Sequence, residues 1–178
     1  MTSQKTPAGA QFPVIRVSGP GRAELTLGKP QGGHDWQMVV VYRGAHCPMC
    51  TTYLKELEAL LPEFHALGVD VIAVSADPEY KARDQLARIK PGFAVGFDLS
   101  VGQMHQIGLY VSAPRSPEGT DRPFAEPGIF EVNANGQVQV TDISNAPFAR
   151  PDLRNLLAGI RFIRNPENSY PIRGTRAA

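Results

Sequence analysis

Cysteine is scarce in this chain of 178 residues, which contains only Cys47 and Cys50. A structural zinc site needs about four ligands, and the two cysteines and four histidines repeat no ligand spacing. Two cysteines three positions apart, in a chain without an export signal, are typical of a redox or metal-binding pair rather than of a structural disulfide. The scarcity of cysteine therefore draws attention to one short motif.

Charge of one sign is also lacking, because the formal net charge is +1 and the basic residues form no run. Nothing predicts nucleic acid or an anionic membrane as a partner. The longest apolar stretch, around Met38 to Tyr42, is too short to span a bilayer. Residues 1–10 carry one lysine and no apolar stretch, so they do not read as a secretory signal. We therefore expect a cytoplasmic protein.

The sequence predicts one domain between two polar ends. We expect a flexible N-terminus over residues 1–11, a domain over residues 12–164 and a surface tail over residues 165–178. The N-terminal part of the domain predicts a hairpin from two short strands, at Val14 to Val17 and Glu24 to Leu27. This hairpin is an extension before the main alternation of strands and helices.

The main alternation begins with a β-branched run typical of a buried strand, Met38 to Tyr42. The expected elements that follow are a helix from Cys47 to Leu67, a strand from Val69 to Ser75, a helix from Pro78 to Ile89 capped by Asp77, a strand from Phe93 to Phe97, a helix from Leu99 to Leu109, a polar loop from Val111 to Glu126, a hairpin from Gly128 to Thr141 and a helix from Arg150 to Arg164. A parallel front half and an antiparallel back half predict an α/β fold. Its central mixed β-sheet is flanked by helices on both faces, with the N-terminal hairpin as an extension.

The two cysteines stand where the first buried strand hands over to the first helix. Residues three apart share one helix face, so the two sulfurs can reach bonding distance in the first turn. Unpaired N–H groups at a helix N-terminus favour a thiolate, and Pro48 suits the first turn because it has no N–H to lose. The motif Cys47-Pro48-Met49-Cys50 therefore predicts a redox-active dithiol. Metal binding and a purely structural role are the alternatives that remain open.

The stretch Tyr42-Arg43-Gly44-Ala45-His46-Cys47-Pro48-Met49-Cys50, with the leucine-rich helix after it and Val71-Ile72-Ala73-Val74-Ser75, carries a resemblance. It resembles the peroxiredoxin-like branch of the thioredoxin superfamily, the branch of alkyl hydroperoxide reductase and thiol-specific antioxidant proteins with a YRGxxCPxC signature. The likeness covers roughly residues 12–160. It implies that the α/β domain has a thioredoxin-like fold and that the protein is a thiol-dependent antioxidant enzyme.

The sequence departs from typical peroxiredoxins at two places. Their Pro-x-x-x-Thr-x-x-Cys loop would put proline at Arg43 and threonine at Cys47 when it is aligned on Cys50. Their arginine before the hairpin is missing, because Glu126 and Pro127 stand there instead. These departures predict slow peroxide reduction at most.

Four further residues are candidates to support the chemistry of the two cysteines. Pro127 occupies the place of the cis-proline that thioredoxin-fold proteins keep beside the CxxC motif, so we expect a cis bond there. His46 either stabilises a thiolate and moves a proton or is a plain polar loop residue. Arg43 either brings positive charge to the sulfurs or pairs with a surface carboxylate. Pro48 begins the helix.

We therefore predict a thiol–disulfide oxidoreductase, with Cys47 as the exposed attacking thiolate, Cys50 as the resolving residue, and weak peroxide reduction beside the main reaction. One alternative is a thiol-dependent peroxidase with Cys50 as the attacking residue. The other is a non-enzymatic redox-switch interaction module. No metal, flavin or nucleotide cofactor is expected, because the cysteines carry the electrons. The expected partners are a disulfide-containing protein or a small thiol or peroxide substrate, a thiol reductant such as thioredoxin or glutathione, and a second copy of the chain if it forms a homodimer.

Overall fold

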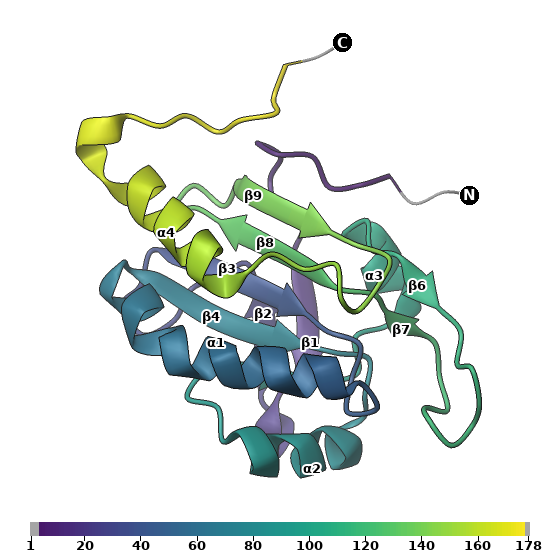
Figure 1. Ribbon diagram of the computed structural model, residues 1–178. Helices are drawn as coiled ribbons and strands as arrows, with labels where there is room; N and C mark the ends of the chain where they lie inside the picture. Colours follow the sequence, from purple (N-terminus) through teal and green to yellow (C-terminus); the bar gives the residue numbers. More distant parts are fainter. Residues whose placement is uncertain (1–3, 177–178) are drawn as a thin grey trace.

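The computed structural model describes residues 4–176, which are built around a mixed sheet of five strands (Figure 1). The strand order is β5-β4-β3-β8-β9. The central strand β3 pairs in parallel with β4 and antiparallel with β8. The strands are β3 (Trp36–Val41), β4 (Val69–Val74), β5 (Ala94–Gly96), β8 (Gly128–Val132) and β9 (Val138–Ile143). The predicted change from parallel to antiparallel pairing is confirmed.

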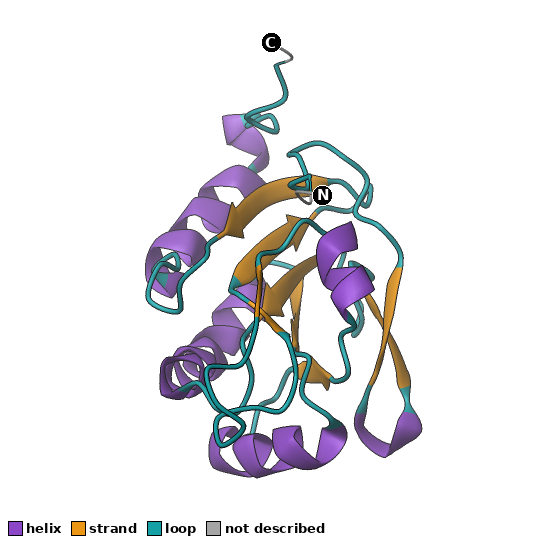
Figure 2. Cartoon of the chain, turned by 90° about the vertical axis from the view of Figure 1, so that its right-hand side faces the viewer, coloured by secondary structure: helices purple, strands orange, loops and turns teal. Residues whose placement is uncertain are grey.

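Helices cover both faces of this sheet (Figures 1 and 2). One face packs against α1 (Pro48–Ala66), α2 (Glu79–Ile89) and α4 (Leu153–Arg164). The other face packs against α3 (Val101–Gln106) and the N-terminal hairpin of β1 (Ile15–Ser18) and β2 (Glu24–Leu27). Short 3-10 turns occur at η1 (Pro20–Arg22) and η2 (Pro166–Asn168). The α/β fold class, thioredoxin-like with an N-terminal hairpin extension, is confirmed.

The apolar run of β3 is explained by burial on both faces of the sheet. Met38 and Val40 contact the α1 side, while Val39 and Val41 contact the opposite core. On α1, Leu54, Leu57, Leu61 and Phe64 are all buried, as helical spacing requires for a stripe against the sheet. These two buried surfaces fix where β3 ends and α1 begins, and so they fix the cysteine motif between them.

Three predicted elements differ from the structure. The helix expected after Asp77 begins at Glu79, and Asp77 does not cap it. The last helix begins at Leu153 with Asp152 as its cap, so Arg150 lies in the preceding loop rather than in the helix. The expected polar loop contains a short antiparallel pair, β6 (Val111–Ser112) with β7 (Phe124–Ala125).

The described part of the chain's N-terminal segment is hydrogen-bonded to the domain. The Lys5 ammonium donates to the Gly108 carbonyl at 2.8 Å, and the Gly9 N–H donates to the Val138 carbonyl at 2.8 Å. The expected flexible N-terminus and surface tail extend to residues 1–3 and 177–178, which lie outside the described residues. Among residues 4–176, no helix has both the length and the apolar character needed to cross a bilayer.

Candidate functional site

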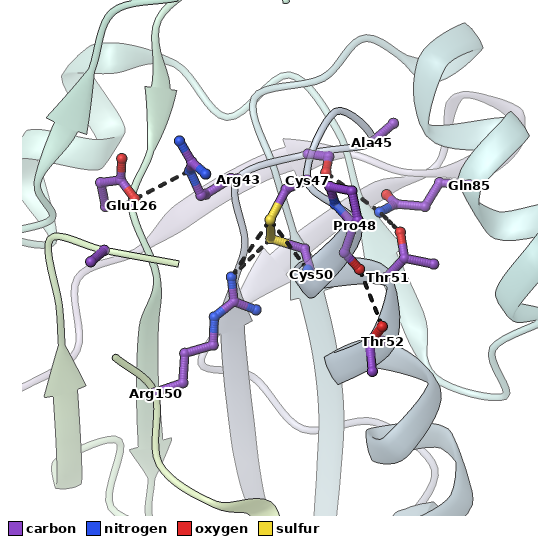
Figure 3. The surroundings of a disulfide bond; sticks show 12 residues. Arg43, Ala45, Cys47, Pro48, Cys50, Thr51, Thr52, Gln85, Glu126 and Arg150 are labelled. Carbon is purple, nitrogen blue, oxygen red and sulfur yellow. Dashed lines mark hydrogen bonds and ion pairs between the residues drawn. A yellow bond between two sulfur atoms is a disulfide. The ribbon is translucent and has the colours of Figure 1, made fainter. Parts of the chain in front are cut away.

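The predicted cysteine motif lies at the carboxyl end of β3, where the chain turns into α1. Cys47 is the residue that caps α1, and its sulfur accepts a hydrogen bond from the Cys50 N–H at 3.2 Å. Pro48 is the first residue of the helix, where its missing N–H costs nothing. The two cysteines form a disulfide, with Cα atoms 5.2 Å apart (Figure 3). A helix N-terminus therefore offers a backbone donor to one of the two sulfurs.

This disulfide is buried, which corrects the expectation that Cys47 is exposed. Cys47 is 2% exposed and Cys50 is fully buried. Between them, Pro48 and Met49 face solvent, because the first turn of α1 turns its outer side away from the core. Access to the sulfurs therefore depends on side chains that cover them.

Arg150 is the side chain that reaches both sulfurs, and sequence reasoning missed it. Its Nη2 donates to the Cys50 sulfur at 2.8 Å and lies 3.9 Å from the Cys47 sulfur (Figure 3). It comes from the loop between β9 and α4, one hundred residues after Cys50. The arginine expected before the hairpin is absent from that place, but a guanidinium approaches the sulfurs from another element. Burial lowers the pKa of Arg150.

The Asp77 side chain holds the loop that leads into Cys47. The Asp77 carboxylate, which is buried, accepts a hydrogen bond from the Ala45 N–H at 2.6 Å. Gly44 lies against the same carboxylate with a φ of +125°. On α2, Gln85 donates to the Thr51 hydroxyl at 3.0 Å and to the Gly44 carbonyl at 3.5 Å. The end of β4 and the helix after it therefore shape this loop.

Arg43 forms an ion pair with Glu126, between Arg43 Nε and Glu126 Oε2 at 3.2 Å. The carboxylate is buried rather than at the surface, with a side chain 6% exposed. Its other oxygen accepts a hydrogen bond from the Ser112 hydroxyl at 2.6 Å. The Arg43 guanidinium also lies over the Phe124 ring, 4.8 Å from its centroid. Arg43 thus connects the loop between β3 and α1 to β7 and to Glu126 beside it.

His46 packs edge-on against the same Phe124 ring, at 4.6 Å between centroids. Burial lowers the pKa of His46, opposed by the negative charge of Asp77 and assisted by the positive charge of Arg43. Neither ring nitrogen has a hydrogen-bond partner among the described residues. A neutral imidazole supplies no positive charge to a thiolate, although it can accept a proton.

The expectation of a cis bond before Pro127 is wrong. No peptide bond in residues 4–176 is cis, so the Glu126–Pro127 bond is trans. Pro127 is buried, and its carbonyl accepts a hydrogen bond from the Ser144 N–H at 3.1 Å. The chain before β8 is held by the Arg43–Glu126 ion pair and by the hydrogen bond from Ser144, with the bond before Pro127 in the trans form.

No group of three or more histidine, cysteine, aspartate or glutamate side chains is arranged to hold a metal ion within residues 4–176. The groups in contact with the two sulfurs are the Arg150 guanidinium and the backbone at the N-terminus of α1.

Comparison with solved structures gives the same fold at low sequence identity. Peroxiredoxin 6 of Arenicola marina is 18% identical with a TM-score of 0.76, covering 90% of this chain and 74% of that one. Peroxidoxin BcpB of Mycobacterium tuberculosis is 17% identical with a TM-score of 0.73, covering 90% and 99%. A protein described as thiol:disulfide interchange protein DsbE, from Chlorobium tepidum, is 18% identical with a TM-score of 0.62, covering 88% and 99%.

Among curated protein sequences, none matches this chain. A family model does match, over residues 8–141, which include the whole sheet up to the middle of β9 together with the cysteine motif. With the fold and the Cys47–Cys50 disulfide, this match supports a redox function and the resemblance read from the YRGxxCPxC stretch. The chain belongs to the AhpC/TSA family.

Proposed function

We propose that this protein is a thiol–disulfide oxidoreductase that cycles Cys47 and Cys50 between a dithiol and a disulfide. The observation that carries the proposal is the disulfide at the N-terminus of α1, with a separate donor on each sulfur. The Cys50 N–H serves the Cys47 sulfur, and Arg150 serves the Cys50 sulfur. Hydrogen bonds and positive charge at a sulfur favour the thiolate, which is the reactive form.

In the reduced protein, Cys47 gives up its proton, and the resulting thiolate attacks one sulfur of a substrate disulfide while the other substrate sulfur leaves as a thiolate. The mixed disulfide is then attacked by the Cys50 thiolate, which displaces the second substrate thiolate and closes the Cys47–Cys50 bond. The protein loses two electrons to the substrate, and the two substrate thiolates take up one proton from Cys47 and one from water. An external thiol reductant, of the thioredoxin or glutathione class, reverses these steps and restores the dithiol.

Arg150 can assist Cys50 both when the cysteine pair is oxidised and when it is reduced. As the resolving residue, Cys50 must be a thiolate, and a guanidinium 2.8 Å from its sulfur favours that form. When an external thiol attacks Cys47, Cys50 is the leaving group, and a leaving thiol of lower pKa departs faster.

The same contact supports a second candidate function, a peroxidase in which Cys50 attacks first. The Cys50 thiolate would take one oxygen from the peroxide and become a sulfenic acid, while hydroxide or an alkoxide leaves and takes a proton from solvent to become water or an alcohol. The Cys47 thiol would then condense with it, forming the disulfide and releasing water. Arg150 beside Cys50 favours this candidate, because peroxide reduction needs a cationic donor near the attacking sulfur. The position before Cys50 that carries threonine in typical peroxiredoxins is Cys47, and this disfavours it.

The third candidate is a redox switch without turnover, which gains weight because the bond before Pro127 is trans. An enzyme recycles with a reductant, whereas a switch reacts once.

For the enzyme, we propose the cytoplasm as its compartment, protein disulfides or small disulfides and peroxides as substrates, and a homodimer as its assembly. The cysteine pair needs no metal, flavin or nucleotide, and the charge pattern suits neither nucleic acid nor membrane.

Parallel rate constants with insulin disulfides and with hydrogen peroxide, in the presence of a thiol reductant, test the proposal. We expect multiple turnovers and a faster reaction with insulin. A faster peroxide reaction would promote the peroxidase, and a single turnover with both would promote the switch. Mass spectrometry of Cys47→Ser and Cys50→Ser after one equivalent of each oxidant identifies the attacking sulfur, which we expect to be Cys47.

A further inference from the structure

The position of Arg150 is not set by an acidic partner. Within residues 4–176 it forms no ion pair with a carboxylate, and its buried Nε has no hydrogen-bond partner. An arginine side chain has considerable rotamer freedom, so holding it in one place costs entropy. Its contact with the sulfurs therefore requires another feature of the site to hold it.

Tyr53, which like Cys50 lies on α1, also contacts Arg150. It follows Cys50 by three positions, so both side chains lie on one face of the helix, one turn apart. The Arg150 guanidinium lies over the Tyr53 ring, 5.2 Å from its centroid. The Tyr53 hydroxyl donates a hydrogen bond to the Pro151 carbonyl at 2.9 Å. Tyr53 thus holds both the side chain of Arg150 and the backbone immediately after it.

The next residue of the loop is also fixed. Asp152 caps α4 by accepting a hydrogen bond from the Asn155 N–H at 2.8 Å. Burial raises the pKa of the Tyr53 hydroxyl far above its ordinary value, so the hydroxyl stays protonated and remains a donor. The loop is therefore anchored on the helix that carries the cysteines and on the start of the helix that follows it.

We propose that Tyr53 is a positioning residue that holds the Arg150 guanidinium against the Cys50 sulfur and so favours the Cys50 thiolate. The proposal deepens the proposed function, on which it rests for its role in the reaction. Reduction of the disulfide by two external thiols delivers two electrons. Of the two thiol protons, one goes to Cys47 and the other to water, Cys50 remains a thiolate paired with Arg150, and the external thiols leave as their disulfide.

The test measures the pKa of Cys50 alone, in the full chain carrying Cys47→Ser. Serine is a good helix cap, so this background keeps the α1 N-terminus. Thiolate absorbance is followed against pH with Tyr53, with Tyr53→Phe, which keeps the ring but loses the hydroxyl, and with Tyr53→Leu, which loses both. Arg150→Gln removes the charge, and Tyr80→Leu, at an exposed position on α2, is the matched control.

We expect Arg150→Gln to raise the pKa of Cys50 by about one unit or more, as for a thiolate that loses a nearby cation. Tyr53→Leu should approach that shift, Tyr53→Phe should give a smaller one, and Tyr80→Leu should give none. The decisive comparison is the double variant: with Arg150→Gln already present, Tyr53→Leu should add no further shift.

A Cys50 pKa unchanged by Tyr53→Leu overturns the proposal, and so does a Tyr53 effect that persists without Arg150. If Tyr53→Leu fails to fold, Tyr53→Phe decides alone, with the same criterion. The reduction potential of the intact cysteine pair, measured in glutathione buffers, should be lower in the variants that raise the pKa of Cys50. The decrease should be largest for Arg150→Gln, smaller for Tyr53→Leu and smallest for Tyr53→Phe. None of these measurements needs substrate turnover, so their failure is distinguishable from failure of the proposed function.

Discussion

Gly44, in the loop between β3 and α1, lies at a position where a residue with a side chain would be strained. Its φ of +125° is a conformation that side-chain-bearing residues rarely adopt. A Cβ there would also lie 2.6 Å and 2.8 Å from the two Asp77 carboxylate oxygens. The buried carboxylate is itself held by the Ala45 N–H, so it cannot move away without losing a hydrogen bond. Backbone conformation and packing therefore both require glycine.

We predict that Gly44→Ala destabilises the protein by about 1–3 kcal/mol from backbone strain, with a further cost from the contact with Asp77. Urea unfolding measures the change. The matched control is Gly33→Ala, which has a φ of +81° and open space where its Cβ would stand. Equal losses in the two variants would show that the Asp77 contact contributes nothing.

At the level of elements, α1 receives its cysteines in position because β4 and α2 hold the loop before it. Asp77 follows the end of β4 and accepts the Ala45 N–H, while Gln85 of α2 binds Thr51 in the first turn of α1. Because the donor and acceptor at Ala45 and Asp77 are removed from water, losing one leaves the other unsatisfied.

Asp77→Ala should therefore cost about 1–3 kcal/mol of stability and expose the Ala45 amide. Asp77→Asn should retain most of the stability, since its amide oxygen can accept the same hydrogen bond. Hydrogen exchange at the Ala45 amide checks the mechanism. If that amide is equally protected in both variants, the hydrogen bond is not what holds the loop.

Asp77 also shows how far sequence could be read. Strands such as β3 and the hairpin of β8 and β9 were predictable, because an apolar run and a turn motif are local patterns. Asp77 before Pro78 looks like a helix cap for the same local reason, but its carboxylate bonds to Ala45, thirty-two residues away. Arg150 carried no local signal at all, since only the fold brings it to Cys50. The cysteine motif could be found from sequence and its surroundings could not.

At the scale of the whole molecule, the core between the sheet and α1 contains a carboxyl group, that of Glu131, for which residues 4–176 supply no hydrogen-bond partner. Glu131 on β8 points to the same face of the sheet as the core residue Ile129, two positions before it, and is fully buried. Neither of its carboxylate oxygens has a hydrogen-bond partner among the described residues. Burial raises the pKa of Glu131 to about 8, with the positive charge of Arg164 acting in the opposite direction. At neutral pH the folded protein therefore keeps this carboxyl group protonated.

The unfolded chain releases that proton near the ordinary pKa of 4.5, whereas the folded chain retains it up to about 8. Between these values the folded state binds more protons, so we predict that the Glu131 contribution to stability falls as pH rises, by at most about 1.4 kcal/mol per pH unit. Glu131→Gln should remove this fall, so its advantage over the wild type should grow from pH 5 to pH 8. Denaturation at both pH values measures it, and Glu63→Gln, at a half-exposed site on α1, controls for the loss of one carboxylate. An advantage that is constant with pH would contradict the prediction.

The hundred residues between Cys50 and Arg150 also set an order of events during synthesis. The cysteines leave the ribosome long before the loop that covers them, and β8, the antiparallel neighbour of β3, is made in between. At about 5–20 residues per second, the thiols of the nascent chain remain uncovered for seconds. During that interval they meet the surrounding thiols and oxidants without the guanidinium that later covers them. Each new molecule therefore encounters the redox conditions of its surroundings before its site is complete.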